Sequence, residues 1–328
     1  MKILMVTRSN DDQCAQRVME ALENNGHQGF RWDTDSYPVH CALSSGYGLK
    51  NDHRILQTAD FELDIQQIDA VYFRRFEAGL SLPENLGEFR QACYEESVQS
   101  VCGFLASLSC FQLDPYWAIR RAELKECQIE IARRLGLQTP RTLFSNQAEK
   151  VRDFAAEVGG PIVAKAQTKT IIYRNQEDQA AFTTRVDLDN IQGLEYSPAI
   201  FQEEIAKKLE LRATVVGNKV FCAAIDSTQS DVGATDYRLD NELSSGWREW
   251  ELPEPVSRAL LELVRRFGLN YSAADIILTP DDRYVFLEIN SAGEWVWLAR
   301  DLNLPIASAL VEVLTDPLRR LVGLEQQW

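Results

Sequence analysis

The sequence predicts an α/β (α+β) fold in three parts: an N-terminal α/β domain over residues 1–115, a central subdomain over 116–200 and a C-terminal subdomain over 201–328. Two observations support this prediction. In the first part, strand-like apolar stretches alternate with amphipathic helical stretches, which is typical of a parallel sheet. In the last part, apolar strands are joined by short turns, which indicates antiparallel hairpins. A chain of 328 residues is long enough for two or three such units.

The N-terminal domain is predicted to begin with a buried strand at Lys2–Thr7. Because the chain turns polar directly after it, this segment is a first strand and not a signal peptide. Apolar residues then recur at helical spacing until Gly26. A second strand is expected at Ala70–Phe73 and a long helical region at Glu84–Ser109. The turn Arg8–Gln13 lacks the GxGxxG pattern, so a nicotinamide-binding Rossmann site has no support.

The central subdomain is predicted to follow a boundary near Asp114-Pro115. Two apolar stretches, Thr170–Tyr173 and Ala181–Val186, flank a polar loop and are expected to pair as a hairpin. The other elements expected in this region are helices at Arg121–Leu135 and Gln147–Val158, and strands at Arg141–Phe144, Ile162–Lys165 and Ala199–Glu203.

The C-terminal subdomain is predicted to contain two hairpins. The turn Gly217-Asn218-Lys219 between two apolar runs is a strong signal for the first, and Pro280–Arg283 forms the turn of the second. The elements expected here are strands at Leu211–Val216, Val220–Ile225, Ala273–Thr279 and Tyr284–Asn290, a loop over 226–236, a helix at Pro255–Phe267 and a C-terminal helix.

Composition excludes several classes of protein. The net charge of −15 disfavours nucleic acids and anionic membranes as partners, because their phosphates are repelled. Taken alone, that charge is better explained by an acidic surface that only maintains solubility. The seven cysteines form no CxxC pair, and His27, His40 and His53 all lie in the first sixth of the chain, so a zinc site or a histidine triad is not expected. Scattered cysteines without such pairs indicate a cytoplasmic protein.

The stretch SAADIILTPDDRYVFLEIN contains the clearest chemical signal. If Thr279 faces Tyr284, then Asp275 lies directly opposite Glu288, and Asn290 shares the face of Glu288. Two opposed carboxylates repel each other, and burying them without compensation costs more. Two carboxylates and an amide oxygen are suitable ligands for Mg²⁺. The alternative is a solvent-facing sheet surface.

Two lysines are candidates for holding phosphates. Lys125 begins an amphipathic helix, and Lys165 ends an apolar strand, where its charge needs solvent or an anionic partner. A surface position is the alternative for Lys125.

The stretch FQEEI at Phe201–Ile205 is followed by ELR at Glu210–Arg212. If the strand stops within FQEEI, its free backbone N–H and C=O groups can pair with the edge of an adenine. A surface loop with a local ion pair is the alternative there.

In this order, the two lysines, the paired glutamates, the ELR strand and the D…E-x-N hairpin resemble the ATP-grasp superfamily from about Asp114 to the C-terminus. Within it, the chain resembles the graspetide, or microviridin-type, peptide ligases over nearly its whole length. The stretches that carry this resemblance are VYFRR at Val71–Arg75, RRLGLQTPRTL at Arg133–Leu143 and FLEINSAGEWVWL at Phe286–Leu298. The N-terminal domain then corresponds to a pre-ATP-grasp domain, and the other two parts to the central and C-terminal grasp subdomains.

The resemblance implies an ADP-forming ligase that uses ATP and Mg²⁺. The phosphates would contact Lys125 and Lys165, the adenine Gln202, Glu203, Glu204 and Ile205, the ribose Glu210, and Mg²⁺ Asp275, Glu288 and Asn290. Arg212 and Arg238 would neutralise the acyl phosphate and the transferred phosphoryl group. An Asp or Glu carboxylate of a ribosomal precursor peptide would be phosphorylated, and a Ser or Thr hydroxyl or a Lys amine would then displace phosphate. The product is an ω-ester or ω-amide macrocycle.

The implied partner is the leader and core of that precursor peptide, and a homodimer is a further expectation. The hairpin at Thr170–Val186 is the candidate leader-binding element, with Tyr173, Glu177, Asp178 and Asp187 as its candidate contacts. Arg74 and Arg75 are candidates to face the carboxylates of the peptide, and a surface charge pair at a strand end is the alternative.

Two residues depart from the microviridin-type pattern: Ser291 stands where Pro is common, and Glu294 where Gln is common. Neither departure removes an expected metal ligand. Two other functions stay open, namely an ATP-grasp ligase of a free amino acid or a protein tail, and a non-catalytic module that binds ATP and a peptide.

Overall fold

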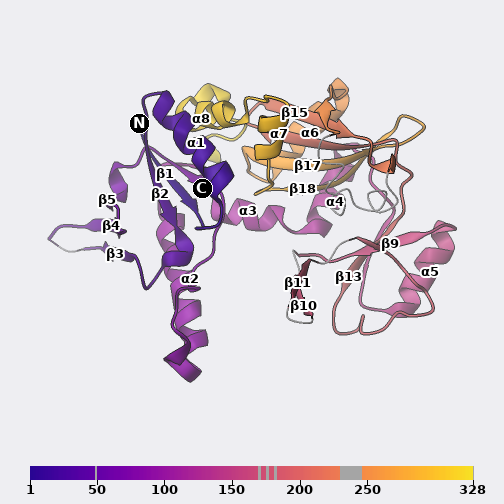
Figure 1. The fold of residues 1–328 in the computed structure, drawn as a ribbon, viewed down its shortest axis with the longest axis horizontal. Helices are drawn as coiled ribbons and strands as arrows, with labels where there is room; N and C mark the ends of the chain where they lie inside the picture. The colour runs from indigo at the N-terminus through magenta and orange to yellow at the C-terminus, as the bar shows by residue number, and fades with distance from the viewer. Residues whose placement is uncertain (49, 169–170, 175–176, 181–182, 230–245, 328) are drawn as a thin grey trace.

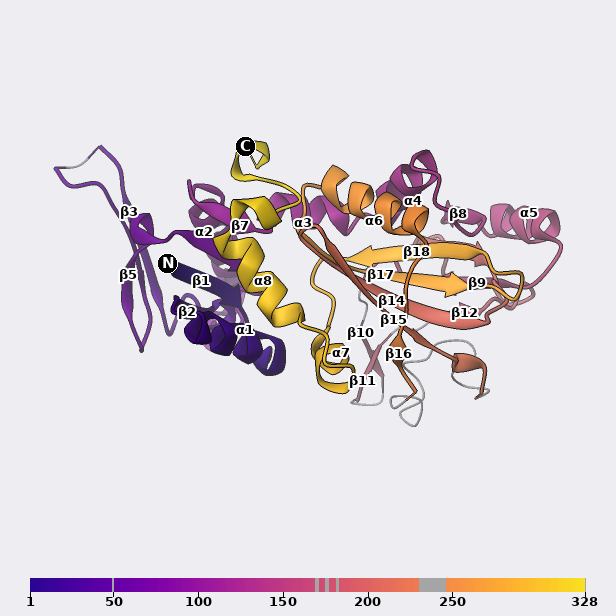
Figure 2. The ribbon, with the colours of Figure 1, turned by 90° about the horizontal axis from the view of Figure 1, so that it is seen from above.

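The computed structural model describes residues 1–48, 50–168, 171–174, 177–180, 183–229 and 246–327. The molecule is elongated, with the N-terminal sheet at one end and the central sheet with α5 at the other (Figures 1 and 2). The large C-terminal sheet lies above the central sheet in the view of Figure 1. None of the helices in the described part of the chain is both long and apolar enough to cross a membrane.

The N-terminal domain is built on a parallel sheet in the order β2-β1-β6-β7. Side chains alternate along β1, so Ile3 and Met5 share a core with α1 and α8, whereas Leu4 and Val6 face the core that contains α2. Its elements are β1 (Lys2–Thr7), α1 (Asp12–Asn24), β2 (Gln28–Asp33), β6 (Ala70–Phe73), α2 (Arg90–Ala106), β7 (Phe111–Leu113) and the C-terminal α8 (Ile306–Thr315), with a separate antiparallel sheet of β3 (Ala42–Gly46), β4 (His53–Gln57) and β5 (Glu62–Asp64).

The predicted helical region Glu84–Ser109 begins later than expected. A 3₁₀ segment covers Glu84–Phe89, and Gly87 interrupts it with a φ of 55° and a ψ of −128°. The α-helix therefore begins only at Arg90.

The central subdomain begins with two helices, α3 and α4, instead of the one helix predicted over Arg121–Leu135. Leu124 has an extended backbone and caps the second helix, so Lys125 lies in its first turn. Beyond them, an antiparallel sheet in the order β12-β9-β13-β8 is covered by α5. The elements are α3 (Tyr116–Ala122), α4 (Lys125–Arg134), β8 (Thr142–Ser145), α5 (Ala148–Val158), β9 (Ile162–Lys165), β10 (Ile171–Arg174), β11 (Glu177–Ala180), β12 (Thr184–Arg185) and β13 (Ala199–Glu203).

The hairpin predicted in this subdomain exists, but its second strand was assigned wrongly. β10 pairs with the polar stretch Glu177–Ala180, whereas Thr184–Arg185, inside the predicted strand, pairs with β9. Main-chain hydrogen bonds form a ladder whatever the polarity of the side chains, so the apolar pattern was a poor guide to this pairing. Residues 169–170, 175–176 and 181–182 lie outside the described residues.

The C-terminal subdomain is an antiparallel sheet in the order β16-β15-β14-β17-β18 (Figure 2). One face packs against α6, because Leu211, Ala213 and Val215 of β14 share a core with the apolar face of that helix. The alternate side chains of β14 therefore lie on the other face. The elements are β14 (Leu209–Val216), β15 (Lys219–Ile225), β16 (Arg248–Glu249), α6 (Glu254–Arg266), β17 (Tyr271–Leu278), β18 (Tyr284–Asn290) and α7 (Val296–Asp301).

The last hairpin has the predicted alignment of its carboxylates for an unpredicted reason. Leu278, and not Thr279, pairs with Tyr284. An irregularity between Asp275 and Ile276 then shifts the register by one residue. As a result Asp275 does lie opposite Glu288, although the predicted pairing of Thr279 with Tyr284 was wrong.

Candidate active site

Three polar side chains meet on β17 and β18. Asn290 donates its amide hydrogens to the Asp275 Oδ2 and the Glu288 Oε1 atoms, both at 3.1 Å. The register shift brings the two carboxylates opposite each other on one face of the sheet. A flip of the Asn290 amide would present its oxygen to the same point, giving three oxygen donors on one side. This donor set fits a hard divalent cation such as Mg²⁺.

Two lysines from different elements approach Glu288. The Glu288 Oε2 atom lies 3.1 Å from the Lys125 Nζ atom on α4 and 3.8 Å from the Lys165 Nζ atom at the end of β9. Burial by itself raises the pKa of the Glu288 carboxyl, but the ammonium groups of Lys125 and Lys165 outweigh it and hold this pKa well below its ordinary value. The two predicted phosphate contacts and a predicted metal ligand thus lie in one cluster.

Arg212 completes the cluster from β14. Its Nη1 atom lies 2.7 Å from the Asp275 Oδ1 atom, and its Nη2 atom donates to the Glu294 carbonyl oxygen at 3.3 Å. Gly293 leaves the space for this guanidinium, because a Cβ atom there would lie 2.6 Å from the Arg212 Nη2 atom. The other predicted arginine, Arg238, lies outside the described residues.

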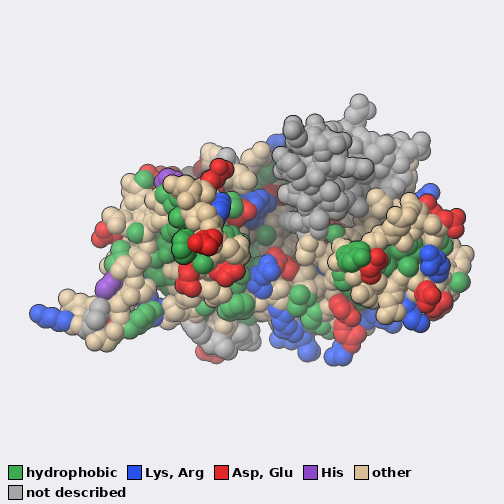
Figure 3. Space-filling model, turned by 90° about the horizontal axis from the view of Figure 1, so that it is seen from below, with side chains coloured by type: hydrophobic (Ala, Val, Ile, Leu, Met, Phe, Trp, Pro, Cys, Tyr) green, Lys and Arg blue, Asp and Glu red, His purple; other side chains and the backbone are tan. Residues whose placement is uncertain are grey.

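The cluster has a positive surplus. Three cations, Lys125, Lys165 and Arg212, surround two carboxylates, Asp275 and Glu288. A chain of net charge −15 therefore offers an anion a locally favourable site. In the space-filling view from below, side chains of both charges, Lys and Arg as well as Asp and Glu, appear in the middle of the molecule (Figure 3).

Gln128 is a site residue that the sequence did not reveal. It is buried on α4, donates to the Ile289 carbonyl oxygen at 2.9 Å and accepts from the Ile289 N–H at 2.9 Å. It thereby holds the backbone of β18 between Glu288 and Asn290. The available signal was its place three residues after Lys125, which puts both on one helix face.

The residues predicted to face the base and ribose of a nucleotide, namely Gln202, Glu203, Glu204, Ile205 and Glu210, lie at the end of β13, on the connection after it and on β14. The paired acids point to different partners. Glu203 forms an ion pair with Arg141 at 2.9 Å, and Glu204 binds Arg185 at 2.8 Å.

The other two polar residues of this set have local partners. Gln202 is buried and donates to the Thr142 Oγ1 atom at 3.0 Å. Glu210 lies 2.9 Å from the Lys207 Nζ atom. The local ion pairs that the sequence offered as the alternative for this stretch are therefore present. Contacts of these residues with a nucleotide stay a prediction.

The predicted leader contacts fall into two places. Tyr173 and Asp178 are register partners in the hairpin of β10 and β11, next to Glu177. Asp187 is exposed, follows β12 and accepts from the Asp189 N–H at 3.1 Å. It therefore belongs to the edge of the central sheet and not to the hairpin.

Arg74 and Arg75 lie where the N-terminal domain meets the loop after β18. Arg74 has a side chain that is 0% exposed, 2.9 Å from Asp11 and 3.0 Å from Glu294. Arg75 is 18% exposed and pairs with the other Glu294 oxygen. The Cys14 thiol donates to the Glu294 Oε2 atom at 3.0 Å.

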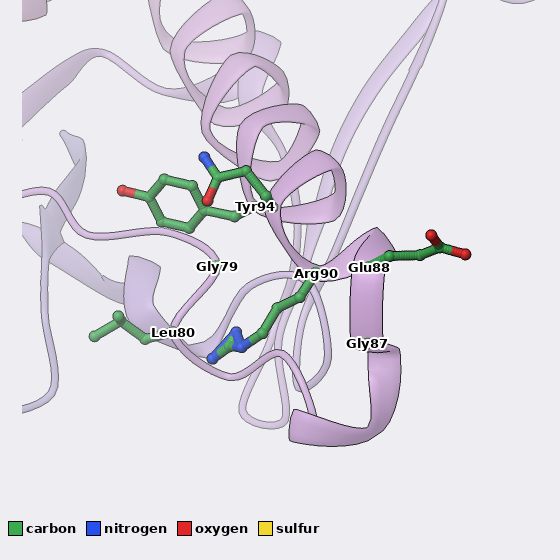
Figure 4. Close-up of a pocket in the computed structure, with 7 residues that line it drawn as sticks. Gly79, Leu80, Gly87, Glu88, Arg90 and Tyr94 are labelled. Atoms are coloured by element: carbon green, nitrogen blue, oxygen red, sulfur yellow. The ribbon is translucent and has the colours of Figure 1, made fainter.

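A surface hollow of about 430 Å³ lies away from this cluster, at the start of α2. Leu80, Arg90 and Tyr94 point toward the hollow, whereas Glu88 points away from it (Figure 4). None of the predicted site residues lines it. The convergence of charged groups, and not the shape of this hollow, therefore identifies the candidate site.

Comparison with known proteins finds ATP-grasp ligases that are similar to this chain. Residues 2–120 match the family described as MvdD pre-ATP grasp domain. A RiPP-associated ATP-grasp ligase of Chryseobacterium gregarium, solved with ADP and a leader and core peptide, is 33% identical, with 98% of both chains covered and a TM-score of 0.92. The macrocyclase MdnC of Microcystis aeruginosa MRC, solved with the precursor peptide MdnA, is 39% identical over 96% of this chain and 99% of that one, with a TM-score of 0.87. A probable alpha-L-glutamate ligase of Vibrio atlanticus (strain LGP32) is 23% identical over 96% of this chain and 95% of its own.

Proposed function

Because the chain belongs to the family of RiPP-associated ATP-grasp ligases, we propose that it closes ω-ester or ω-amide rings in a ribosomal precursor peptide. The single observation that supports this most is the convergence of Lys125, Lys165 and Arg212 on the opposed carboxylates Asp275 and Glu288. Such a group suits phosphoryl transfer, in which positioning and neutralisation of charge supply most of the catalysis.

The residues have separate tasks in this proposal. Asp275, Glu288 and Asn290 hold Mg²⁺, which supplies Lewis-acid neutralisation of the phosphates when bound. Lys125 and Lys165 exchange the Glu288 carboxylate for phosphate oxygens of ATP when the nucleotide enters. Arg212 neutralises the phosphoryl group as it moves to a side-chain carboxylate of the peptide, and Arg238 is proposed to assist.

The second step needs no further activation by ATP. A hydroxyl or amine of the same peptide attacks the acyl phosphate, forms the ester or amide bond, loses its proton and releases phosphate. Because both groups belong to one bound peptide, the step is effectively intramolecular. Gln202, Glu203, Glu204, Ile205 and Glu210 are proposed to border the base and ribose.

Peptide recognition is proposed to use the hairpin of β10 and β11, with Tyr173, Glu177 and Asp178 as leader contacts and Asp187 beside it. Replacing residues 171–180 with a short Gly-Ser loop should abolish the advantage of a leader-bearing peptide over a bare core. Equal turnover of both peptides by the wild type would contradict leader recognition itself.

In this proposal, residues 1–115 form the pre-ATP-grasp domain, residues 116–200 the central grasp subdomain and residues 201–328 the C-terminal grasp subdomain.

The location and assembly of the protein are also proposals. The seven cysteines are all free, which fits a cytoplasmic protein. A homodimer is proposed from the sequence alone, and light scattering of the purified chain would test it.

The main experiment is mass spectrometry of the precursor peptide encoded beside the gene, incubated with the protein, ATP and Mg²⁺. Each ring should remove the mass of one water, with ADP formed in parallel. Glu288→Gln should slow both by about 10²- to 10³-fold. A peptide of unchanged mass would contradict the proposal.

The similarity to a probable alpha-L-glutamate ligase supports a second candidate, a ligase that adds a free amino acid. Its signature would be ADP formation that requires a free amino acid and proceeds without the precursor peptide. The same assay with glutamate in place of the peptide distinguishes the two functions.

A further inference from the structure

We propose that Arg74 and Arg75 form a carboxylate-binding subsite for the core peptide, and that Glu294 occupies it until an acidic side chain of the peptide takes its place. This inference rests on the proposed function and adds a specificity determinant to it. It concerns the junction between the N-terminal domain and the loop that follows the metal-binding strand.

Arg74 is held in this subsite by contacts that do not involve Glu294. The Arg74 side chain is fully buried and lies 2.9 Å from the Asp11 carboxylate. The hydroxyl of Thr7 donates to the same Asp11 oxygen at 2.6 Å. Arg74 therefore keeps its position when Glu294 moves away.

Glu294 is the exchangeable partner. Its side chain is 46% exposed, whereas the side chains of Arg74 and Arg75 are 0% and 18% exposed. One carboxylate oxygen lies 3.0 Å from the Arg74 Nη2 atom, and the other pairs with Arg75. A carboxylate at the surface thus bridges two guanidinium groups that lie deeper than it does.

The charges of Arg74 and Arg75 favour an anionic ligand in this subsite. Among the described residues, two arginines face the carboxylates of Asp11 and Glu294, and without Glu294 the carboxylate that pairs with them is that of Asp11. The surplus positive charge and the planar donors of the guanidinium groups suit another carboxylate. Asp11, Cys14 and Glu294 also have ligand atoms close enough to hold a metal ion. The direct contacts of both arginines oppose a cation there, so the structure favours an anion.

The subsite adjoins the catalytic cluster. The Glu294 carbonyl oxygen accepts from the Arg212 Nη2 atom at 3.3 Å, and the Gly293 carbonyl oxygen accepts from the Tyr271 hydroxyl at 2.6 Å. These bonds hold the backbone of the loop while the Glu294 side chain turns. An acidic side chain in the subsite would then lie beside the arginine proposed to meet its phosphorylated form.

The test is a binding cycle with ADP and Mg²⁺ present. It compares the wild type with Glu294→Gln, and the natural precursor peptide with one whose core Asp and Glu residues are replaced by Asn and Gln. Glu294→Gln should bind the natural peptide about two- to fivefold more tightly, the scale of a partly exposed ion pair. The amide peptide should bind both proteins equally. Arg75→Gln should lose the preference for the acidic peptide.

Glu312→Gln is the matched control, because Glu312 pairs with Lys219 at 2.7 Å with similar exposure, outside the subsite, and should leave both affinities unchanged. If Glu294 only fastens the two domains, Glu294→Gln will unfold at lower temperature and gain no affinity, which overturns the inference. An equal gain for both peptides overturns it as well. Failure of the wild type to bind the natural peptide at all would instead remove the proposed function, and the inference with it.

Discussion

Glu288 is kept charged in a mostly enclosed position by cations that the chain supplies itself. Burial raises the pKa of its carboxyl, and the ammonium groups of Lys125 and Lys165, 3.1 and 3.8 Å away, more than reverse this effect. The same lysines are the proposed partners of the phosphates. The proposed phosphate-binding groups therefore form ion pairs with a proposed metal ligand.

This arrangement predicts opposite effects of Glu288→Gln on binding and on turnover. Removing one negative charge frees the two lysines, so ADP without Mg²⁺ should bind at least as tightly as it binds to the wild type. Turnover should fall by about 10²- to 10³-fold, the usual effect of losing one group that stabilises the transition state. Calorimetry with ADP and the ring-closure assay measure the two effects.

The matched control is Glu312→Gln, because Glu312 forms a partly exposed ion pair with Lys219 at 2.7 Å, outside the proposed site. It should change neither quantity. Weaker ADP binding by Glu288→Gln in the absence of Mg²⁺ would show that the lysines do not act as phosphate contacts in the proposed way.

At the scale of elements, α4 and β18 are joined by one buried side chain. Gln128 exchanges two hydrogen bonds with the backbone of Ile289, each at 2.9 Å. Glu288 and Asn290 flank that residue, so the helix that presents Lys125 also fixes the position of the strand with the proposed metal ligands. Register between the helix and the strand thus determines the distance from lysine to carboxylate.

Gln128→Leu should disturb this joint with little change in volume. It leaves the buried Ile289 N–H without its Gln128 acceptor and removes one of two donors to the Ile289 carbonyl oxygen, the other being the Lys125 Nζ atom at 3.4 Å. This loss should cost about 1–3 kcal/mol of unfolding free energy. The Michaelis constant for ATP should rise as well. Chemical denaturation and steady-state kinetics measure the two quantities, with Gln147→Leu at the cap of α5 as a control outside the joint. Unchanged stability would mean that water replaces the amide without loss.

The sequence predicted most elements of this fold, but not the details that align the site. Periodicity located strands such as Ala70–Phe73 and Tyr284–Asn290 at their observed bounds. It placed Lys125 at the start of a helix, as observed, but it did not predict the shifted register beside Asp275, because that shift depends on local backbone geometry and not on side-chain polarity. Contacts such as that of Glu294 with Arg74 join residues far apart in the chain, and only the folded structure reveals them.

At the scale of the whole molecule, the linear order of the chain is not the order of its domains. The C-terminal helix α8 packs against α1 and the N-terminal sheet, so residues 306–315 share a core with β1. Asp114, directly after β7, adds a polar joint between that sheet and the C-terminal one. Its carboxylate accepts from the backbone N–H groups of Asn270 and Tyr271 at 2.6 and 3.0 Å.

This joint predicts a dependence of stability on pH. Burial raises the pKa of Asp114 to about 7, although the N–H groups of Asn270 and Tyr271 partly oppose it. In the unfolded chain the pKa is about 3.9, so between pH ~4 and ~7 the carboxyl is ionised when unfolded and protonated when folded. Its contribution to the free energy of unfolding is full below pH ~4 and declines as the pH rises to about 7.

Asp114→Asn cannot titrate and should lose only a constant amount for the acceptor that it lacks. The melting temperature of the wild type should therefore fall relative to that of Asp114→Asn between pH ~4 and ~7. Above pH ~7 the difference between the two melting temperatures should stay constant. Thermal unfolding of the two proteins in a matched buffer series measures this difference. Parallel curves across the range would mean that Asp114 is already ionised in the folded protein, with its charge met by the two backbone donors alone.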